Sequence, residues 1–277
     1  MKNHLEIIAL RYLFLVLIIG TSIISFGQTD NPFSLENDKK IRREIREKSF
    51  VSLSNSDIDS LISQYNSLSE IESKCELIEK IDHVRNARII GFLESIVSSD
   101  SSIQIKESVC QSLANLQSES SIPILRSLLR DNSTYVKISA SLALLSMGDT
   151  VCLKEFGIIC YSPNSKYCYS CNLGFLLAEN DESIKFFYYS LKNSPNVFCR
   201  VEAAINLAIL KQPNSAIPDL LSFLKDTDPD VRMAAIRGFA YIGDDKSLEL
   251  IEKMIDDPNN RVKNYATRIL NKFGSSQ

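Results

Sequence analysis

Apolar side chains recur along most of the chain at the spacing of an α-helix, in short segments separated by polar turns. The clearest example is the stretch from Ser215 to Gly243. Its first half has one apolar face, made by Ile217, Leu220, Leu221 and Leu224. Its second half has another, made by Val231, Ala234, Ala235, Phe239 and Ile242. An Asp/Pro-rich turn separates the halves, so the pattern predicts two helices joined by a tight turn.

The same pattern recurs from Ala87 to the end of the chain. One position near the start of each second helix is basic in five of six units: Lys106, Lys137, Arg200, Arg232 and Lys263, with Cys168 in the remaining unit. Successive members are 31 or 32 residues apart. Three residues after each comes a small or compact side chain: Val109, Ala140, Cys171, Ala203, Ala235 and Ala266. Four residues later comes a large one: Leu113, Leu144, Phe175, Leu207, Phe239 and Leu270. A unit of this size cannot bury its apolar face alone, so the repeats are expected to stack.

This periodicity predicts an all-α fold, a right-handed α-solenoid of stacked antiparallel helix pairs. No segment with the period of a β-strand competes with it. Six repeats are expected over residues 86–274, at about 86–117, 118–148, 149–180, 181–212, 213–244 and 245–274. A divergent first helix pair precedes them at residues 51–85, and residues 28–50 form a polar linker that passes into a helix.

Three segments resemble the short HEAT-type repeats of phycobilisome-lyase-like bacterial proteins: DNSTYVKISASLALLSMG, DPDVRMAAIRGFAYIG and DPNNRVKNYATRILNKFG. The resemblance covers about residues 87–274 and implies a binding scaffold, since such repeats only occasionally belong to enzymes. Units of 31–32 residues are shorter than longer HEAT repeats. Tetratricopeptide repeats are of comparable length, but their Trp/Gly/Tyr signature is missing here.

The basic series has two interpretations. A stripe of Lys and Arg side chains could bind an anionic ligand. The resemblance to HEAT repeats instead implies that each basic residue bonds to the Asp side chain or the carbonyls of the preceding turn, which forms a ladder along the stack. Turn acids suitable for this role are Asp131, Asp226, Asp228 and Asp257. We favour the ladder, because repetition in register is expected of a stacking device.

The first 27 residues have the features of a secretory leader. A polar start precedes an apolar block from Tyr12 to Ile19, and the residues Ser25-Phe26-Gly27 suit cleavage after Gly27. Export to the periplasm or the outside is therefore expected, with no membrane insertion after cleavage. An uncleaved leader that anchors the protein is the alternative. The net charge is −3, and removing Lys2, Arg11 and Glu6 makes it −4. Such a chain has no electrostatic signature of nucleic-acid binding.

Four of the seven cysteines lie in the repeat at residues 149–180: Cys152, Cys160, Cys168 and Cys171. In an exported chain they suggest a disulfide, and Cys160 with Cys168 or Cys171 is the pairing we expect most readily. Free buried thiols are a second interpretation. A zinc site is a third, although only the Cys168-x-x-Cys171 half has the usual spacing. Cys75 and Cys110 lie on apolar helical faces and are expected in the core.

The same repeat is rich in aromatic residues. Tyr161, Tyr167 and Tyr169 form a candidate binding patch, because tyrosine offers a large contact area with one polar tip. The alternative is that the phenylalanines nearby are core and the tyrosines cover them.

Catalysis is not expected. Only His83 remains after leader removal, and the chain has no Gly-rich phosphate loop and no evident metal-ligand set. No cofactor or metal is predicted. We expect a scaffold that binds another protein or a peptide along an inner face lined by second helices. The alternatives are an accessory, lyase-like or cofactor-binding protein that uses residues 151–180, and a stabilising subunit of an envelope complex.

Overall fold

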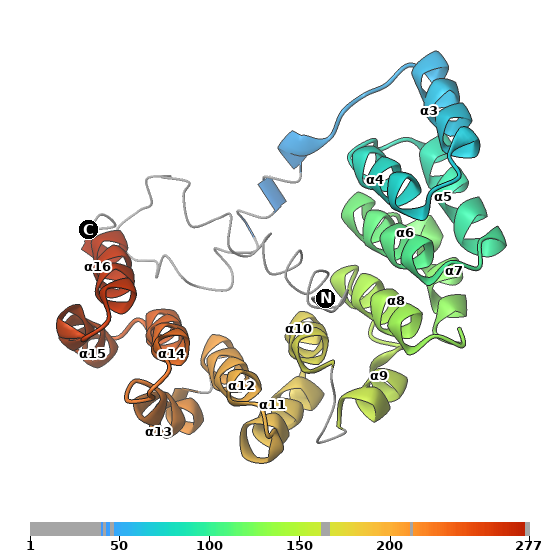
Figure 1. Ribbon diagram of the computed structural model, residues 1–277. Coiled ribbons are helices and arrows are strands. Elements are labelled where there is room, and N and C mark those ends of the chain that lie inside the picture. The colour runs from blue at the N-terminus through green and yellow to red at the C-terminus, as the bar shows by residue number, and fades with distance from the viewer. Residues whose placement is uncertain (1–39, 41–42, 45–46, 162–166, 211–212, 275–277) are drawn as a thin grey trace. The chain divides into compact units, whose positions relative to one another are not determined.

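The computed structural model describes residues 40, 43–44, 47–161, 167–210 and 213–274. Within these ranges the chain is helical and contains no strand, so the predicted all-α solenoid of helix pairs is confirmed (Figure 1). The predicted leader at residues 1–27 and most of the predicted linker at residues 28–50 lie outside the described residues.

The helices form two compact units, and the chain passes from one to the other between Cys160 and Tyr161. The N-terminal unit contains α3 (Asn55–Ser67), α4 (Ile71–Ile81), α5 (Ala87–Ser99), α6 (Ile103–Leu116), α7 (Ile122–Leu128), α8 (Thr134–Ser146) and α9 (Leu153–Cys160). The C-terminal unit contains α10 (Cys168–Ala178), α11 (Asp181–Asn193), α12 (Val197–Ile209), α13 (Pro213–Phe223), α14 (Pro229–Ile242), α15 (Asp245–Lys253) and α16 (Asn260–Gly274).

The division falls inside the repeat expected at residues 149–180. Its first helix, α9, packs on α8, whereas its second helix, α10, packs on α11 and α12. The periodicity predicts that these residues form one repeat of a continuous stack. The helix contacts instead assign the two halves of this repeat to different units.

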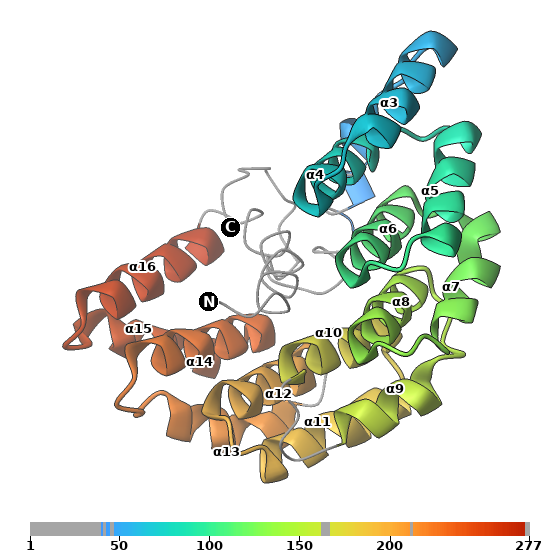
Figure 2. The ribbon, with the colours of Figure 1, turned by 45° about the vertical axis from the view of Figure 1, so that its right-hand side comes forward.

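Each unit has two layers of helices. In the C-terminal unit the second helices α10, α12, α14 and α16 pack side by side in one layer, and α11, α13 and α15 form the other (Figures 1 and 2). In the N-terminal unit α4, α6 and α8 form the corresponding row. We call the exposed side of these rows the second-helix face.

The core lies between the layers and uses the repeated positions. All six compact residues, Val109, Ala140, Cys171, Ala203, Ala235 and Ala266, are fully buried. The large residues are buried as well, except Leu270, which is half-buried because α16 is the last helix of its unit. Packing is close at Gly238 of α14, where an added Cβ would lie 2.7 Å from Leu220 Cδ2 and 3.3 Å from Ile205 Cγ1. The small positions thus let neighbouring helices approach closely.

Candidate functional site

Two of the basic residues bind an aspartate in the turn of the following repeat. Lys106 Nζ donates to Asp131 Oδ2 at 2.7 Å. Arg232 forms a bidentate pair with Asp257, with Nε and Nη2 each 2.8 Å from a carboxylate oxygen. Each aspartate also accepts a backbone N–H two residues later, from Ser133 or Asn259. The carboxylate therefore fixes its own turn and joins it to the preceding repeat.

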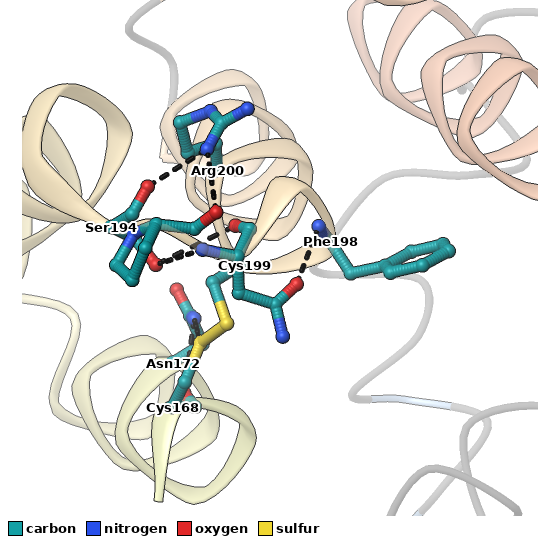
Figure 3. The surroundings of a disulfide bond; sticks show 8 residues. Cys168, Asn172, Ser194, Phe198, Cys199 and Arg200 are labelled. Atoms are coloured by element: carbon teal, nitrogen blue, oxygen red, sulfur yellow. Dashed lines mark hydrogen bonds between the residues drawn. A yellow bond between two sulfur atoms is a disulfide. The ribbon is translucent and has the colours of Figure 1, made fainter. Parts of the chain in front are cut away.

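Two of the basic residues, Arg232 and Arg200, also bind the carbonyls of the preceding turn. Arg232 Nη1 donates to the oxygens of Asp226 and Thr227 at 2.7 and 3.1 Å. Arg200 Nη1 donates to the oxygens of Ser194 and Pro195 at 2.8 and 3.3 Å (Figure 3). These bonds match the arrangement that the resemblance implied, whereas the carboxylates come from the following repeat.

The basic side chains that are bonded to turn aspartates are poorly available to an anionic ligand. Arg232 and Asp257 are buried, and the hydrogen bond from Arg232 lowers the pKa of Asp257. Lys263 adds to that lowering. For Asp131, burial opposes ionisation, but the bond from Lys106 and the charge of Lys137 lower its pKa. These groups hold one repeat to the next, as a ladder does.

Cys168, which replaces the basic residue in the third repeat, forms a disulfide with Cys199 (Figure 3). The bond joins α10 to α12 across a Cα–Cα distance of 6.2 Å. Of the two pairings expected from the sequence, Cys160 with Cys168 is therefore wrong, because Cys168 is bonded to Cys199. The two cysteines are 31 residues apart, which is one repeat, and stacking brings such positions of neighbouring second helices together. The turn before α12 has no aspartate, so a covalent bond stands where the repeats of Lys106 and Arg232 use an ion pair.

The remaining cysteines are of two kinds. Cys160 and Cys171 are each disulfide-bonded. Cys75, Cys110 and Cys152 are free, and the last two are buried. No group of three or more His, Cys, Asp or Glu side chains in the described ranges is arranged to hold a metal ion.

The predicted tyrosine patch is partly a packed aromatic cluster. The ring of Tyr161 makes edge contacts with Phe175, Phe186 and Tyr189, at centroid distances of 6.1, 5.5 and 5.0 Å. The Tyr189 hydroxyl donates to the Tyr161 carbonyl oxygen at 2.6 Å. Tyr167 and Tyr169, at the start of α10, are half-buried. Tyr161 thus contributes to packing around α10 and α11.

Two buried carboxyl groups lie in the N-terminal unit. Asp82 accepts a hydrogen bond from Asn115 Nδ2 at 2.7 Å, and its Oδ1 lies 3.1 Å from His83 Nε2. Burial raises the pKa of Asp82 despite the bond from Asn115. Glu107 of α6 is only 5% exposed, and its Oε1 has no hydrogen-bond partner among the residues that the structure describes. Burial raises the pKa of Glu107 from 4.5 to about 7.

Replacing Glu107 by Gln is expected to stabilise the N-terminal unit at alkaline pH. Because the folded state favours the neutral acid, the wild type loses stability as the pH rises from 4.5 to about 7. A shift of this size corresponds to about 2–3 kcal/mol, so Gln should gain that much at pH 8 and almost nothing at pH 4. Urea unfolding at both pH values measures the difference. An equal effect of the substitution at pH 4 and pH 8 would contradict the assignment.

The second-helix face of the C-terminal unit carries a group that the sequence analysis did not single out. Glu202 of α12, Arg237 of α14, and Tyr265 and Arg268 of α16 form what we call the Arg/Tyr cluster. Arg237 Nη2 donates to Glu202, with both side chains about one-fifth exposed. Arg237 Nε is buried and has no hydrogen-bond partner within the described part of the chain. The guanidinium of Arg268 lies over the Tyr265 ring, 5.1 Å from its centroid.

Charge and burial oppose each other within the Arg/Tyr cluster. Burial disfavours the charge on Arg237, but Glu202 outweighs burial and raises the pKa of the guanidinium. Burial raises the pKa of the Tyr265 hydroxyl, and the nearby Arg237 and Arg268 act against it. The sequence could have revealed the cluster through its position in the repeat, because its members lie two or five positions after Arg200, Arg232 and Lys263.

The comparisons with known proteins agree with this architecture. The HEAT repeat family matches residues 58–152 and 184–276. The chain belongs to the HEAT repeat family. The stretch between the two matches contains α10 and three of the four disulfide-bonded cysteines.

Solved structures match this chain at low sequence identity, and the first of them has a similar fold. The complex of CpcE and CpcF of phycocyanin lyase from Nostoc sp. PCC7120 matches with a TM-score of 0.53 and 15% identity, over 77% of this chain and 86% of that one. Human deoxyhypusine hydroxylase matches with a TM-score of 0.35 and 15% identity, over 97% and 98%. No curated protein sequence matches this chain. Among the described residues, no helix has the length and apolar character needed to cross a bilayer.

Proposed function

We propose that this HEAT-repeat chain is a non-catalytic scaffold that binds another protein through its second-helix faces. The Arg/Tyr cluster is the observation that carries the proposal. The buried positions of the repeats are alike from unit to unit, whereas the half-buried and exposed positions of α12, α14 and α16 differ and bring arginine and tyrosine side chains together. Arginine and tyrosine are the residues that most often dominate the binding energy of protein interfaces.

The ladder supports this role because it makes a stiff support for the exposed side chains. The bidentate pair of Arg232 and Asp257 and the disulfide of Cys168 and Cys199 each join one repeat to the next. A rigid surface loses less conformational freedom on binding than a mobile one. The similar structure of CpcE and CpcF is itself a complex of two proteins, and we extend association with a protein to this chain as part of the proposal.

We also propose that the protein functions outside the cytoplasm. The support is the leader-like pattern of residues 1–27 together with the disulfide-bonded cysteines of the C-terminal unit. Disulfides form and persist in oxidising compartments.

Site-specific photo-crosslinking tests the scaffold proposal. A photoreactive amino acid is placed on the second-helix faces, at Gln111 of α6 or Ala234 of α14, both half-buried. Matched controls carry it on the other layer, at Ser222 of α13 or Lys246 of α15, both exposed. After irradiation of intact cells, we expect a discrete cross-linked protein from at least one second-helix position. Cross-links only from the control positions, or none from any position, would overturn the proposal.

A further inference from the structure

Resting on the proposed function, we propose that the Arg/Tyr cluster and the adjoining groove on α16 form the docking site for an acidic segment of the partner protein. The cluster consists of Glu202, Arg237, Tyr265 and Arg268. The partner segment would be rich in Asp and Glu, and its carboxylates would bind the guanidinium groups.

Charge distribution is the first support for an acidic partner. α16 contains Arg261, Lys263, Arg268 and Lys272 and no acidic residue, in a chain whose net charge is −3. Arg261 is paired with Asp230 at 2.8 Å, and Lys263 lies near Asp257. In the cluster, the one carboxylate, Glu202, is already bound by Arg237. The exposed guanidinium of Arg268 lies over a ring instead of beside a carboxylate.

Hydrogen-bonding groups at the site are the second support. Arg268 is exposed and the Arg237 side chain is about one-fifth exposed, whereas the unpartnered Arg237 Nε is buried, so a ligand would meet the outer parts of these two side chains. A guanidinium offers donors in a planar fork that matches the two oxygens of a carboxylate. Acidic side chains are therefore the peptide groups that best suit both arginines.

A groove next to the cluster extends the same chemistry. It is a shallow, open groove on the surface of α16, lined by Asn264, Thr267, Arg268, Asn271 and Lys272. Arg268 belongs to both the groove and the cluster, so the two form one continuous surface along α16. The asparagine amides donate hydrogen bonds, as do the basic side chains. The groove therefore provides a second contact region for a segment that begins at the cluster.

A peptide suits this surface better than a small free anion because of the aromatic ring. Tyr265 presents a half-buried ring between Arg237 and Arg268. Such a ring adds contact area for the apolar groups of a peptide, which an isolated anion does not have. The remainder of the protein is acidic, so attraction must be local and should weaken as salt screens it.

Peptide binding to the full chain tests the proposal. The probe is a fluorescently labelled 15-residue peptide in which Glu and Asp alternate with Leu and Tyr, and its matched control replaces Glu and Asp with Gln and Asn. At low salt we expect the acidic peptide to bind and the amide peptide to bind at least about tenfold more weakly, because it lacks the charge-assisted contacts.

Variants of exposed residues locate the binding. Arg268→Gln is expected to weaken acidic-peptide binding about five- to tenfold, as for an interface arginine. Lys246→Gln removes the same charge from an exposed position on α15 in the other layer, and binding should change less than about twofold. Equal binding of the two peptides, equal effects of the two variants, or no binding would each overturn the proposal. So would binding of a sulfated polysaccharide in the absence of acidic-peptide binding.

The two proposals fail separately. A protein that cross-links from Ala234 but binds the Arg268→Gln variant as well as the wild type would leave the scaffold function standing and overturn the acidic-segment site. If peptide binding depends on Arg268 but no protein is cross-linked from the second-helix faces, the acidic-segment site would stand and the scaffold function would be overturned.

Discussion

Replacing Asp257 by Ala is expected to lower the free energy of unfolding of the C-terminal unit by about 3–5 kcal/mol, because it leaves the buried Arg232 without its counter-charge. The substitution also removes the acceptor for the Asn259 N–H. Urea unfolding followed by circular dichroism measures the loss. Hydrogen exchange at the α14 and α16 amides localises it.

Asp230→Ala is the matched control for this prediction. Asp230 pairs with Arg261 at 2.8 Å, but both side chains are largely exposed, so its loss should cost less than about 1 kcal/mol. The free energy of unfolding at low pH provides a second check. Arg232 lowers the pKa of Asp257, so its contribution is present above the unfolded pKa of about 4 and is lost as the pH falls further. The gap between wild type and Asp257→Ala should therefore narrow in acid. Equal losses in the two variants at neutral pH would rule out the ladder as a stabilising device.

Replacing both Cys168 and Cys199 by Ala is expected to lower the free energy of unfolding of the C-terminal unit by about 3–4 kcal/mol. The bond closes a loop between residues 31 apart, and closing a loop of that length restricts the unfolded chain by about this amount. A thermal or urea unfolding curve of the double variant provides the measurement.

Cys110→Ala is the control that separates packing from the covalent bond. Cys110 is a free, fully buried cysteine, so its replacement removes a buried sulfur without breaking a disulfide. We expect it to cost about 1 kcal/mol, well below the double variant. If the double variant were destabilised no more than Cys110→Ala, the disulfide would contribute nothing beyond the packing of its sulfur atoms.

The repeat and its core could be predicted because they depend on local periodicity. Ala203, Ala235 and Ala266 were identified as close-packing positions from spacing alone, and all three are fully buried. Small residues recur at one register position because each second helix meets its neighbours in the same way. One repeated pattern therefore specified the helix pairs and the layer between them.

Contacts between repeats were harder to predict. The partner of Cys168 depends on how far one second helix slides along the next, which spacing within a single repeat does not show. The same is true of Asp257, which lies in the turn after Arg232 and not before it. The isolated carboxyl of Glu107 could not be anticipated either, because a glutamate on a mostly polar helix edge gives no sign that its neighbours will bury it.

The Arg/Tyr cluster shows a different limit. Its members come from three repeats and stand out only when the repeats are aligned and the exposed positions are compared. The Cys- and Tyr-rich repeat attracted attention because its composition is unusual, yet Tyr161 lies in a packed aromatic group.

The disulfide between α10 and α12 also determines how the C-terminal unit would respond to a mechanical load. In a stack where each repeat contacts only its neighbours, a pull along the stack acts on the contacts between successive repeats. The disulfide holds α10 to α12, so these two helices cannot separate unless the S–S bond is cleaved. A pull along this unit would therefore first separate the repeats between α12 and α16, which are held together by non-covalent contacts. The contact between α10 and α12 is therefore the last to separate when the unit is pulled at its ends.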